Sequence, residues 1–196
     1  VKNIFSFILT LITLLTVSLY PFNPAQLSLV SALMIGVPSF FLALEPNTDM
    51  VKGKFLRNVL FRAFPAALTA VILVGWSLLF SDAFSLSHEL ASAVAFYLYS
   101  FVAYLMLFKV CKPMNLLHKI LFGSMGILFI LAACIIPEWF NIVSLDYGSA
   151  LILFTLILLA VPINMLIERL FNSFSGWKQK IRNFIIRDIE NHKNEK

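Results

Sequence analysis

The amino-acid sequence contains six long apolar segments that carry no Lys, Arg, Asp or Glu. They are residues 4–20, 27–44, 63–80, 90–108, 120–136 and 149–167. A helix needs about 20 apolar residues to cross ~30 Å of hydrocarbon, and charges are costly at the bilayer centre. The segments do not alternate between polar and apolar residues, as transmembrane strands would. We therefore expect an all-α polytopic membrane protein with six transmembrane helices.

Composition supports the same class of protein. Hydrophobic residues make up 60% of the 196 residues and charged residues only 13%, whereas soluble domains carry about a quarter charged residues. This excludes an ordinary soluble enzyme, a disordered chain and a disulfide scaffold. The two cysteines, Cys111 and Cys134, have no metal-ligand spacing and are expected to stay unpaired.

The basic residues are confined to alternate connections between the apolar segments. All 15 Lys and Arg lie before the first segment, between the second and third, between the fourth and fifth, or after the sixth. The connections 21–26, 81–89 and 137–148 have none. Because basic loops resist translocation, this pattern predicts that both termini are cytoplasmic. The net charge of +5 then reflects topology, and we expect the lipid bilayer, not nucleic acid, as the partner.

The chain divides into four predicted parts. They are a transmembrane hairpin (1–45), a basic cytoplasmic loop (46–60), a supporting bundle of four membrane helices (61–170) and a basic amphipathic tail (171–196). Apolar residues at helical spacing among basic ones favour a tail helix lying on the anionic cytoplasmic leaflet. A specific regulatory helix is the alternative.

The second apolar segment contains a predicted interruption. Pro38 has no backbone N–H, so the carbonyl of Met34 loses its helical partner, and Gly36 adds flexibility beside it. Interrupted helices at the depth of the membrane can bind ions through backbone oxygens. The alternative is a proline kink relieved by neighbouring helices, and this segment alone favours neither.

Other polar and small residues have simpler expected roles. Asn3 and Ser6 lie on one face of the first segment, where they line an ion path or, more often, hydrogen-bond to a packed helix. The same packing role is expected for Asn164. The fifth segment contains Gly123 and Gly126, small residues that permit close helix contact. Surface positions are expected for the histidines His88, His118 and His192.

Residues 35–47 (IGVPSFFLALEPN) and 51–58 (VKGKFLRN) carry a resemblance to a known family. They resemble the end of the sixth membrane helix and the following loop of P-type (E1-E2) cation-transporting ATPases, closest to a bacterial branch associated with calcium transport. Asn3 and Ser31 are also separated as the corresponding ligand asparagines are in animal calcium pumps. The resemblance implies that the segments are membrane helices five to ten, the C-terminal membrane half, in a bacterial plasma membrane.

The resemblance also implies a candidate ion site. The residues expected to line it are Asn3, Ser6, Ser31, Gly36, Pro38 and Ser39. Ile35 stands where well-known pumps have an Asp, Ser6 falls at the position of a carboxylate ligand, and an acidic ligand of the eighth helix falls near Leu105 or Met106. Because divalent cations prefer some charged oxygen ligands, we expect further ligands from helices outside this chain. The ion is calcium or another cation.

The part of these ATPases that hydrolyses ATP is not expected within this sequence. In the family, the phosphorylated Asp of Asp-Lys-Thr-Gly and the nucleotide-binding domain precede the fifth helix, and that motif does not occur here. We therefore expect no catalytic residue and no cofactor in this chain, with Mg-ATP, the N-terminal membrane helices and the cytoplasmic catalytic domains belonging to a parent pump. The start at Val1 fits a piece of such a pump, inactive alone. The alternatives are a self-standing six-helix permease or carrier subunit and a structural membrane subunit.

Overall fold

The computed structural model describes residues 2–16, 19–45 and 55–194, and side chains within 2–15, 19–45 and 63–173. Within these residues every regular element is helical, and no strand occurs, which confirms the all-α prediction. The elements are α1 (Lys2–Thr16), α2 (Pro24–Ser31), the π-helical turn η1 (Ala32–Gly36), α3 (Val37–Ala43), α4 (Phe55–Ala83), α5 (His88–Val110), α6 (Leu116–Ile135), the 3-10 turn η2 (Pro137–Phe140) and α7 (Tyr147–Asn194).

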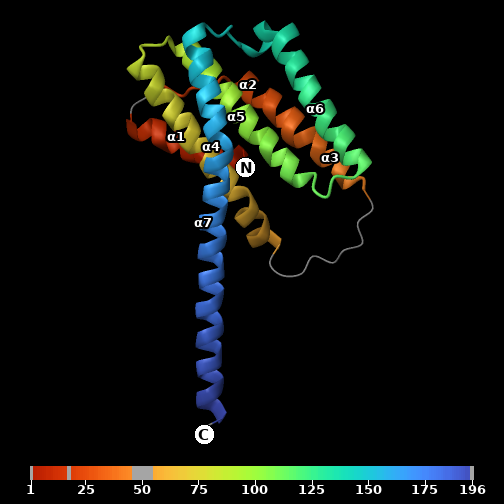
Figure 1. Ribbon diagram of the computed structural model, residues 1–196, viewed down its shortest axis with the longest axis vertical. Helices are drawn as coiled ribbons and strands as arrows, with labels where there is room; N and C mark the ends of the chain where they lie inside the picture. Colours follow the sequence, from red (N-terminus) through yellow and green to blue (C-terminus); the bar gives the residue numbers. More distant parts are fainter. Residues whose placement is uncertain (1, 17–18, 46–54, 195–196) are drawn as a thin grey trace.

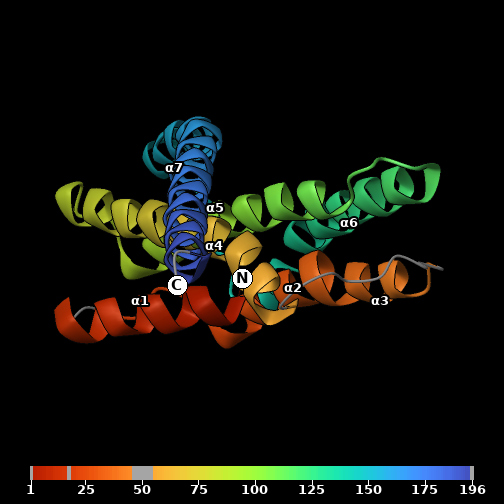
Figure 2. The same cartoon turned by 90° about the horizontal axis from the view of Figure 1, so that it is seen from below.

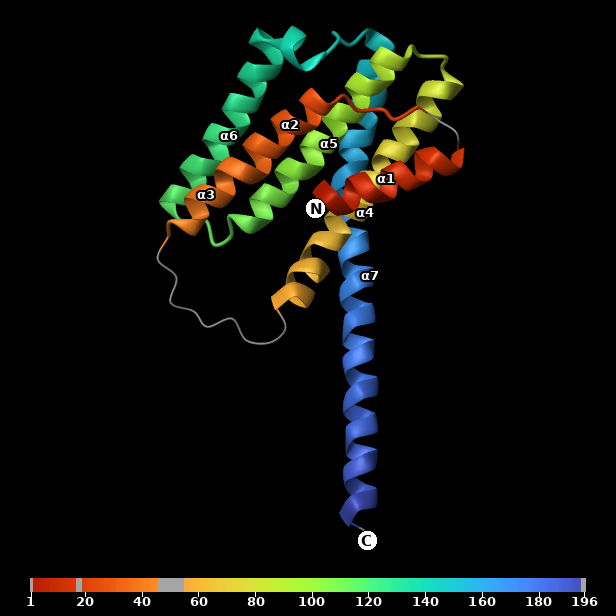
Figure 3. The same cartoon turned by 180° about the vertical axis from the view of Figure 1, so that it is seen from behind.

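Among the residues that the structure describes, five helices are long and apolar enough to cross a membrane. They are Pro24–Ala43 (α2, η1 and α3 together), Ala63–Ala83, His88–Val110, Leu116–Ile135 and Tyr147–Ser173, and they match the second to sixth predicted segments. The first helix, α1, has 15 residues and rises only about 22 Å. It lies at a steep angle to α7 (Figures 1 and 3). A sixth crossing by this helix stays a prediction.

The centre of the bundle is built from α4, α5 and α7, each of which packs against the other two. Small residues on the facing sides, such as Ala67, Ala70 and Ala95, are fully buried and let the helix backbones approach closely. The Thr69 hydroxyl donates to Asn164 Oδ1 at 3.4 Å, which joins α4 to α7. Asn164 therefore has the packing role that the sequence predicted.

Helix α6 packs against α5 through aromatic side chains. The Tyr104 ring stacks on Phe122 with centroids 4.2 Å apart, and its hydroxyl donates to the Phe122 carbonyl at 3.1 Å. A Cβ on Gly126 would lie 2.6 Å from the Tyr104 oxygen, so close contact requires glycine there, as predicted. Gly123 has nothing within 4 Å of its Cβ position. Of the two small residues that permit close helix contact, Gly126 therefore makes one and Gly123 does not.

Helix α7 continues without a break for 48 residues. Its final part projects from the bundle in line with the last span (Figure 1). The tail predicted at 171–196 is therefore helical as far as Asn194, and residues 195–196 lie outside the described part of the chain. Side chains beyond Ser173 are also outside it, so the amphipathic character of this tail stays a prediction.

The end of α3, the α5–α6 connection and the start of α6 lie together at one end of the bundle (Figures 1 and 3). Lys109 in the last turn of α5, Lys112 in the connection and Lys119 in the first turn of α6 belong to this end. Residues 46–54 of the predicted basic loop lie outside the described residues. The side of the membrane that this end faces stays a prediction.

Candidate functional site

The second span is widened at its middle by the π turn Ala32–Gly36. The N–H of Val37 donates to the carbonyl of Ala32, five residues back. Pro38 follows at the start of α3. A proline ring clashes with the carbonyl four residues earlier and has no N–H to offer it, and a wider turn relieves that clash. The interruption predicted from Pro38 is therefore present as a π turn inside a continuing helix.

The π turn leaves backbone carbonyls without helical donors. The carbonyl of Gly36, the N-cap of α3, accepts the first bond of the next helix. Between it and the paired carbonyl of Ala32 lie the carbonyls of Leu33, Met34 and Ile35. Pro38 has no N–H, so the N–H of Ser39 is the only helical donor that remains for these three carbonyl oxygens. Two of the three lack a donor from their own helix, one more than the sequence predicted.

The π turn is covered on one side only. Met34 and Pro38 are buried, whereas Gly36 and Ser39 are exposed, and the covered side packs against α5 and α6. Unpaired carbonyls at membrane depth are tolerated where protein buries them or where they line a wet cavity. The exposed side of the turn therefore leaves room for a further helix or for a bound ion.

The predicted site residues fall into two groups. The Ser31 hydroxyl donates back to the carbonyl of Leu27 in its own helix. On α1, Ser6 is half-buried and Asn3 is exposed, and this helix packs mainly on α4. The second span thus brings together Ser31, Gly36, Pro38 and Ser39, whereas no hydrogen bond within residues 2–16 and 19–45 joins Asn3 to them.

Within the described residues, no group of three or more His, Cys, Asp or Glu side chains is placed to hold a metal ion. The oxygen atoms available at the turn are backbone carbonyls and the hydroxyls of Ser31 and Ser39. These are neutral ligands, which hard cations accept together with charged ones.

A second polar feature lies at the end of the same span, and the sequence did not predict it. His118 is buried, with 6% exposure, so its predicted surface position is wrong. Its Nδ1 lies 2.7 Å from the Pro113 carbonyl oxygen and its Nε2 lies 2.8 Å from Glu45 Oε2. His88 is exposed, as expected, and the side chain of His192 is outside the described part. The sequence held one indication of this contact. Glu45 and His118 each lie next to an apolar segment, in connections that are predicted to face the same side of the membrane.

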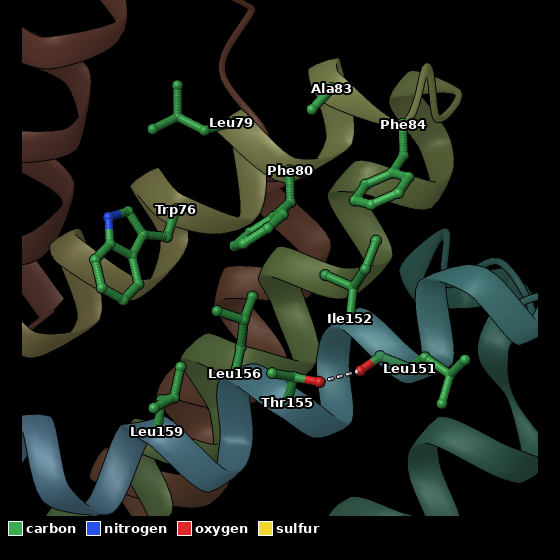
Figure 4. A pocket seen from close by; sticks show the side chains of 10 residues that line it. All are labelled: Trp76, Leu79, Phe80, Ala83, Phe84, Leu151, Ile152, Thr155, Leu156 and Leu159. Carbon is green, nitrogen blue, oxygen red and sulfur yellow. Dashed lines mark hydrogen bonds between the residues drawn. The ribbon is translucent and has the colours of Figure 1, made fainter.

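An apolar groove of about 530 Å³ lies between α4 and α7 (Figure 4). Its lining side chains are Trp76, Leu79, Phe80, Ala83, Phe84, Leu151, Ile152, Thr155, Leu156 and Leu159. The Thr155 hydroxyl already donates to the Leu151 carbonyl at 2.9 Å. The groove therefore offers little to an ion and is not a candidate ion site.

The two cysteines are both unpaired, as predicted. Cys111 is buried and Cys134 is exposed. Burial raises the pKa of the Cys111 thiol, so this group is neutral around pH 7 and is a poor metal ligand.

Comparison with known proteins gives two relatives. No family model matches the chain, and no solved structure matches it. The probable cation-transporting ATPase exp7 of Streptococcus pneumoniae is 27% identical over 175 residues, which is 80% of this chain and 22% of that protein. The calcium-transporting ATPase CtpE of Mycolicibacterium smegmatis is 38% identical over 50 residues, 26% of this chain and 6% of that protein.

The chain therefore spans only a small part of the relatives that it matches. Both relatives carry names of cation-transporting ATPases, the family that residues 35–58 resemble, and the five apolar spans fit a membrane part of such proteins. The chain is therefore similar to a membrane segment of cation-transporting ATPases.

Proposed function

We propose that this chain is the C-terminal transmembrane part of an ATP-driven cation pump and that its second span supplies ligands to the transported ion. The observation that carries the proposal is the π turn at Ala32–Gly36 in the middle of a membrane span. The π register and Pro38 leave carbonyl oxygens without helical donors within a membrane span, and such oxygens can replace the water that an ion sheds there.

The site in this chain is half of a complete one. Two carbonyl oxygens from residues 33–35 and the hydroxyls of Ser31 and Ser39 contribute partial charges only. Ca²⁺ takes six to eight oxygen ligands, several of them carboxylates, at about 2.3–2.6 Å. The exposed side of the turn, with Gly36 and Ser39, is where we expect a helix of the parent pump to add charged ligands. Asn3 and Ser6 would join the site if that helix draws α1 toward the second span.

Energy for transport would come from elsewhere in the parent. Mg-ATP would act at its cytoplasmic catalytic domains, and the resulting movements would open the ion site to each side in turn. The predicted arrangement has both termini in the cytoplasm of a bacterial cell, with the basic connections facing those domains. Calcium is one candidate cargo, since one relative is named a calcium-transporting ATPase.

The test is ATP hydrolysis and ion uptake by the full-length protein in sealed vesicles. ATPase activity should be stimulated by one cation among Ca²⁺, Mn²⁺, excess Mg²⁺, Na⁺ and K⁺, and the same cation should accumulate only when ATP is present. Cation flux that needs no ATP would contradict the proposal and favour the self-standing permease. If both ion flux and cation-stimulated ATP hydrolysis are absent, a structural subunit is favoured.

A further inference from the structure

The Glu45–His118 contact joins two helix ends that are distant in the sequence. Glu45 follows α3, and its N–H bonds to the Leu42 carbonyl at 3.4 Å in the last turn. His118 lies in the first turn of α6, whose N-cap is Asn115. Figures 1 and 3 place these ends side by side. The contact therefore fastens the span that contains the π turn to its neighbour α6.

Both ring nitrogens of His118 face hydrogen-bond acceptors. Nδ1 faces the Pro113 carbonyl oxygen at 2.7 Å, and Nε2 faces Glu45 Oε2 at 2.8 Å. Neither a carbonyl nor an ionised carboxylate can donate a hydrogen bond. A neutral imidazole has one N–H and can satisfy only one of these acceptors. An imidazolium has two and satisfies both.

Burial makes this difference matter. The His118 side chain is 7% exposed and the Glu45 side chain is 37% exposed. Water is therefore poorly placed to replace a missing N–H at the ring, and an unmade hydrogen bond at a buried group is unfavourable. The imidazolium–carboxylate bond, in contrast, is charge-assisted and among the stronger kinds.

Glu45 is the anion that faces His118 among the described residues. The carbonyl of Cys111 also faces the ring, whereas its buried thiol has a raised pKa and carries no charge near pH 7. On the α5–α6 connection, the Lys112 ammonium lies 4.8 Å from the Phe108 ring centroid. On α6, Lys119 is exposed to solvent. The local charge pattern therefore depends on one histidine and one carboxylate.

We propose that His118 is an imidazolium in the folded protein and acts as a proton-dependent clasp between the second span and α6. While charged, it holds Glu45 and the Pro113 carbonyl together. When pH rises and the ring loses a proton, one acceptor is left without a donor and the end of α3 is released. This inference concerns the chain's own conformational equilibrium and stands whether or not the second span binds a cation.

The first test is magic-angle-spinning NMR of the full-length protein in liposomes, with ring-15N-labelled histidine. The His118 signals are identified by their loss in His118→Gln. Both His118 ring nitrogens should show the chemical shift of a protonated nitrogen at pH 7, and one should become unprotonated in Glu45→Gln. An unprotonated ring nitrogen on His118 in the unsubstituted protein at pH 7 overturns the proposal without requiring any variant to fold.

The second test measures whether the clasp opens. Spin labels are placed at Leu44→Cys and Leu117→Cys, both exposed positions, in a background without other reactive cysteines. Electron–electron distance measurements should give one narrow distribution at pH 6 and a broader, longer one at pH 9. Glu45→Gln should give the broad distribution at both pH values, while the control Lys119→Gln keeps the pH response. A distribution that is the same at pH 6 and pH 9 refutes the clasp.

Discussion

Replacing Gly126 by Ala tests how tightly α6 is held on α5. The new Cβ would lie 2.6 Å from the Tyr104 oxygen, 3.1 Å from its Cζ and 3.3 Å from its Cε2. Ordinary carbon–oxygen contact begins near 3.4 Å, so the ring must shift by roughly 1 Å to reach contact distance. The ring is not free to do so, because it stacks on Phe122 and its hydroxyl donates to the Phe122 carbonyl.

The magnitude follows from three opposing effects. Overpacking in a close contact costs about 1–3 kcal/mol, and loss of the tyrosine hydrogen bond adds about 1 kcal/mol. The better helix propensity of Ala offsets up to about 1 kcal/mol. Gly126→Ala should therefore lower the free energy of unfolding by about 1–3 kcal/mol. Gly123→Ala, three residues away with nothing within 4 Å, should be neutral or stabilise by up to about 1 kcal/mol.

The assay uses the buried thiol of Cys111 at the end of α5 as its reporter. In detergent-solubilised protein that also carries Cys134→Ser, a maleimide dye reacts as heating exposes Cys111. The midpoint should fall by about 2–4 °C for each kcal/mol lost in Gly126→Ala and should not fall in Gly123→Ala. Equal shifts for the two variants would refute the contact between Tyr104 and Gly126. Phe in place of Tyr104, which keeps the ring and removes the hydroxyl, should partly rescue Gly126→Ala.

Two further predictions concern the other end of the bundle. Gln26 is fully buried and links the Asn141 carbonyl to the Asn23 N–H. Gln26→Leu should therefore lower the free energy of unfolding by about 1–3 kcal/mol. An unchanged midpoint in the same thermal assay would contradict this. Asp146 accepts from the side chain and backbone N–H of Ser149 at the start of α7, which lowers the pKa of its carboxyl below 3.8. The contribution of this carboxylate to stability should therefore be complete above about pH 4 and disappear as pH falls through the lowered pKa. Asp146→Ala should abolish that part of the loss of stability in acid. The same dependence of the melting midpoint on pH in Asp146→Ala as in the unsubstituted protein would contradict this.

Apolar length predicted six spans, five of which are long enough in the described residues, and Pro38 predicted an interruption in the second. Helix length and the absence of charge depend on local sequence alone, so they can be read directly. The π register could not be predicted, because a proline clash in a helix can be relieved either by a kink or by a wider turn. Without it, only the Met34 carbonyl was expected to be free, whereas the turn leaves two of the carbonyls of residues 33–35 without helical donors.

Contacts between distant segments were the part that the sequence did not reveal. His118 looked like a surface residue because nothing local indicates burial, and its partner Glu45 is 73 residues away. Gly123 and Gly126 looked equivalent for the same reason. Only the rotation of α6 about its axis, which Tyr104 and Phe122 fix, distinguishes them.

The central claim is that the carbonyls freed around Pro38 bind the transported cation, and cation affinity measures it most directly. Ala at position 38 restores an N–H and removes the reason for the π turn. In the full-length protein, Pro38→Ala should raise the cation concentration for half-maximal ATPase activity at least tenfold, about 1.4 kcal/mol. Pro162→Ala, at an exposed proline inside α7, should leave it within about twofold. Normal expression with unchanged cation affinity in Pro38→Ala would contradict the account.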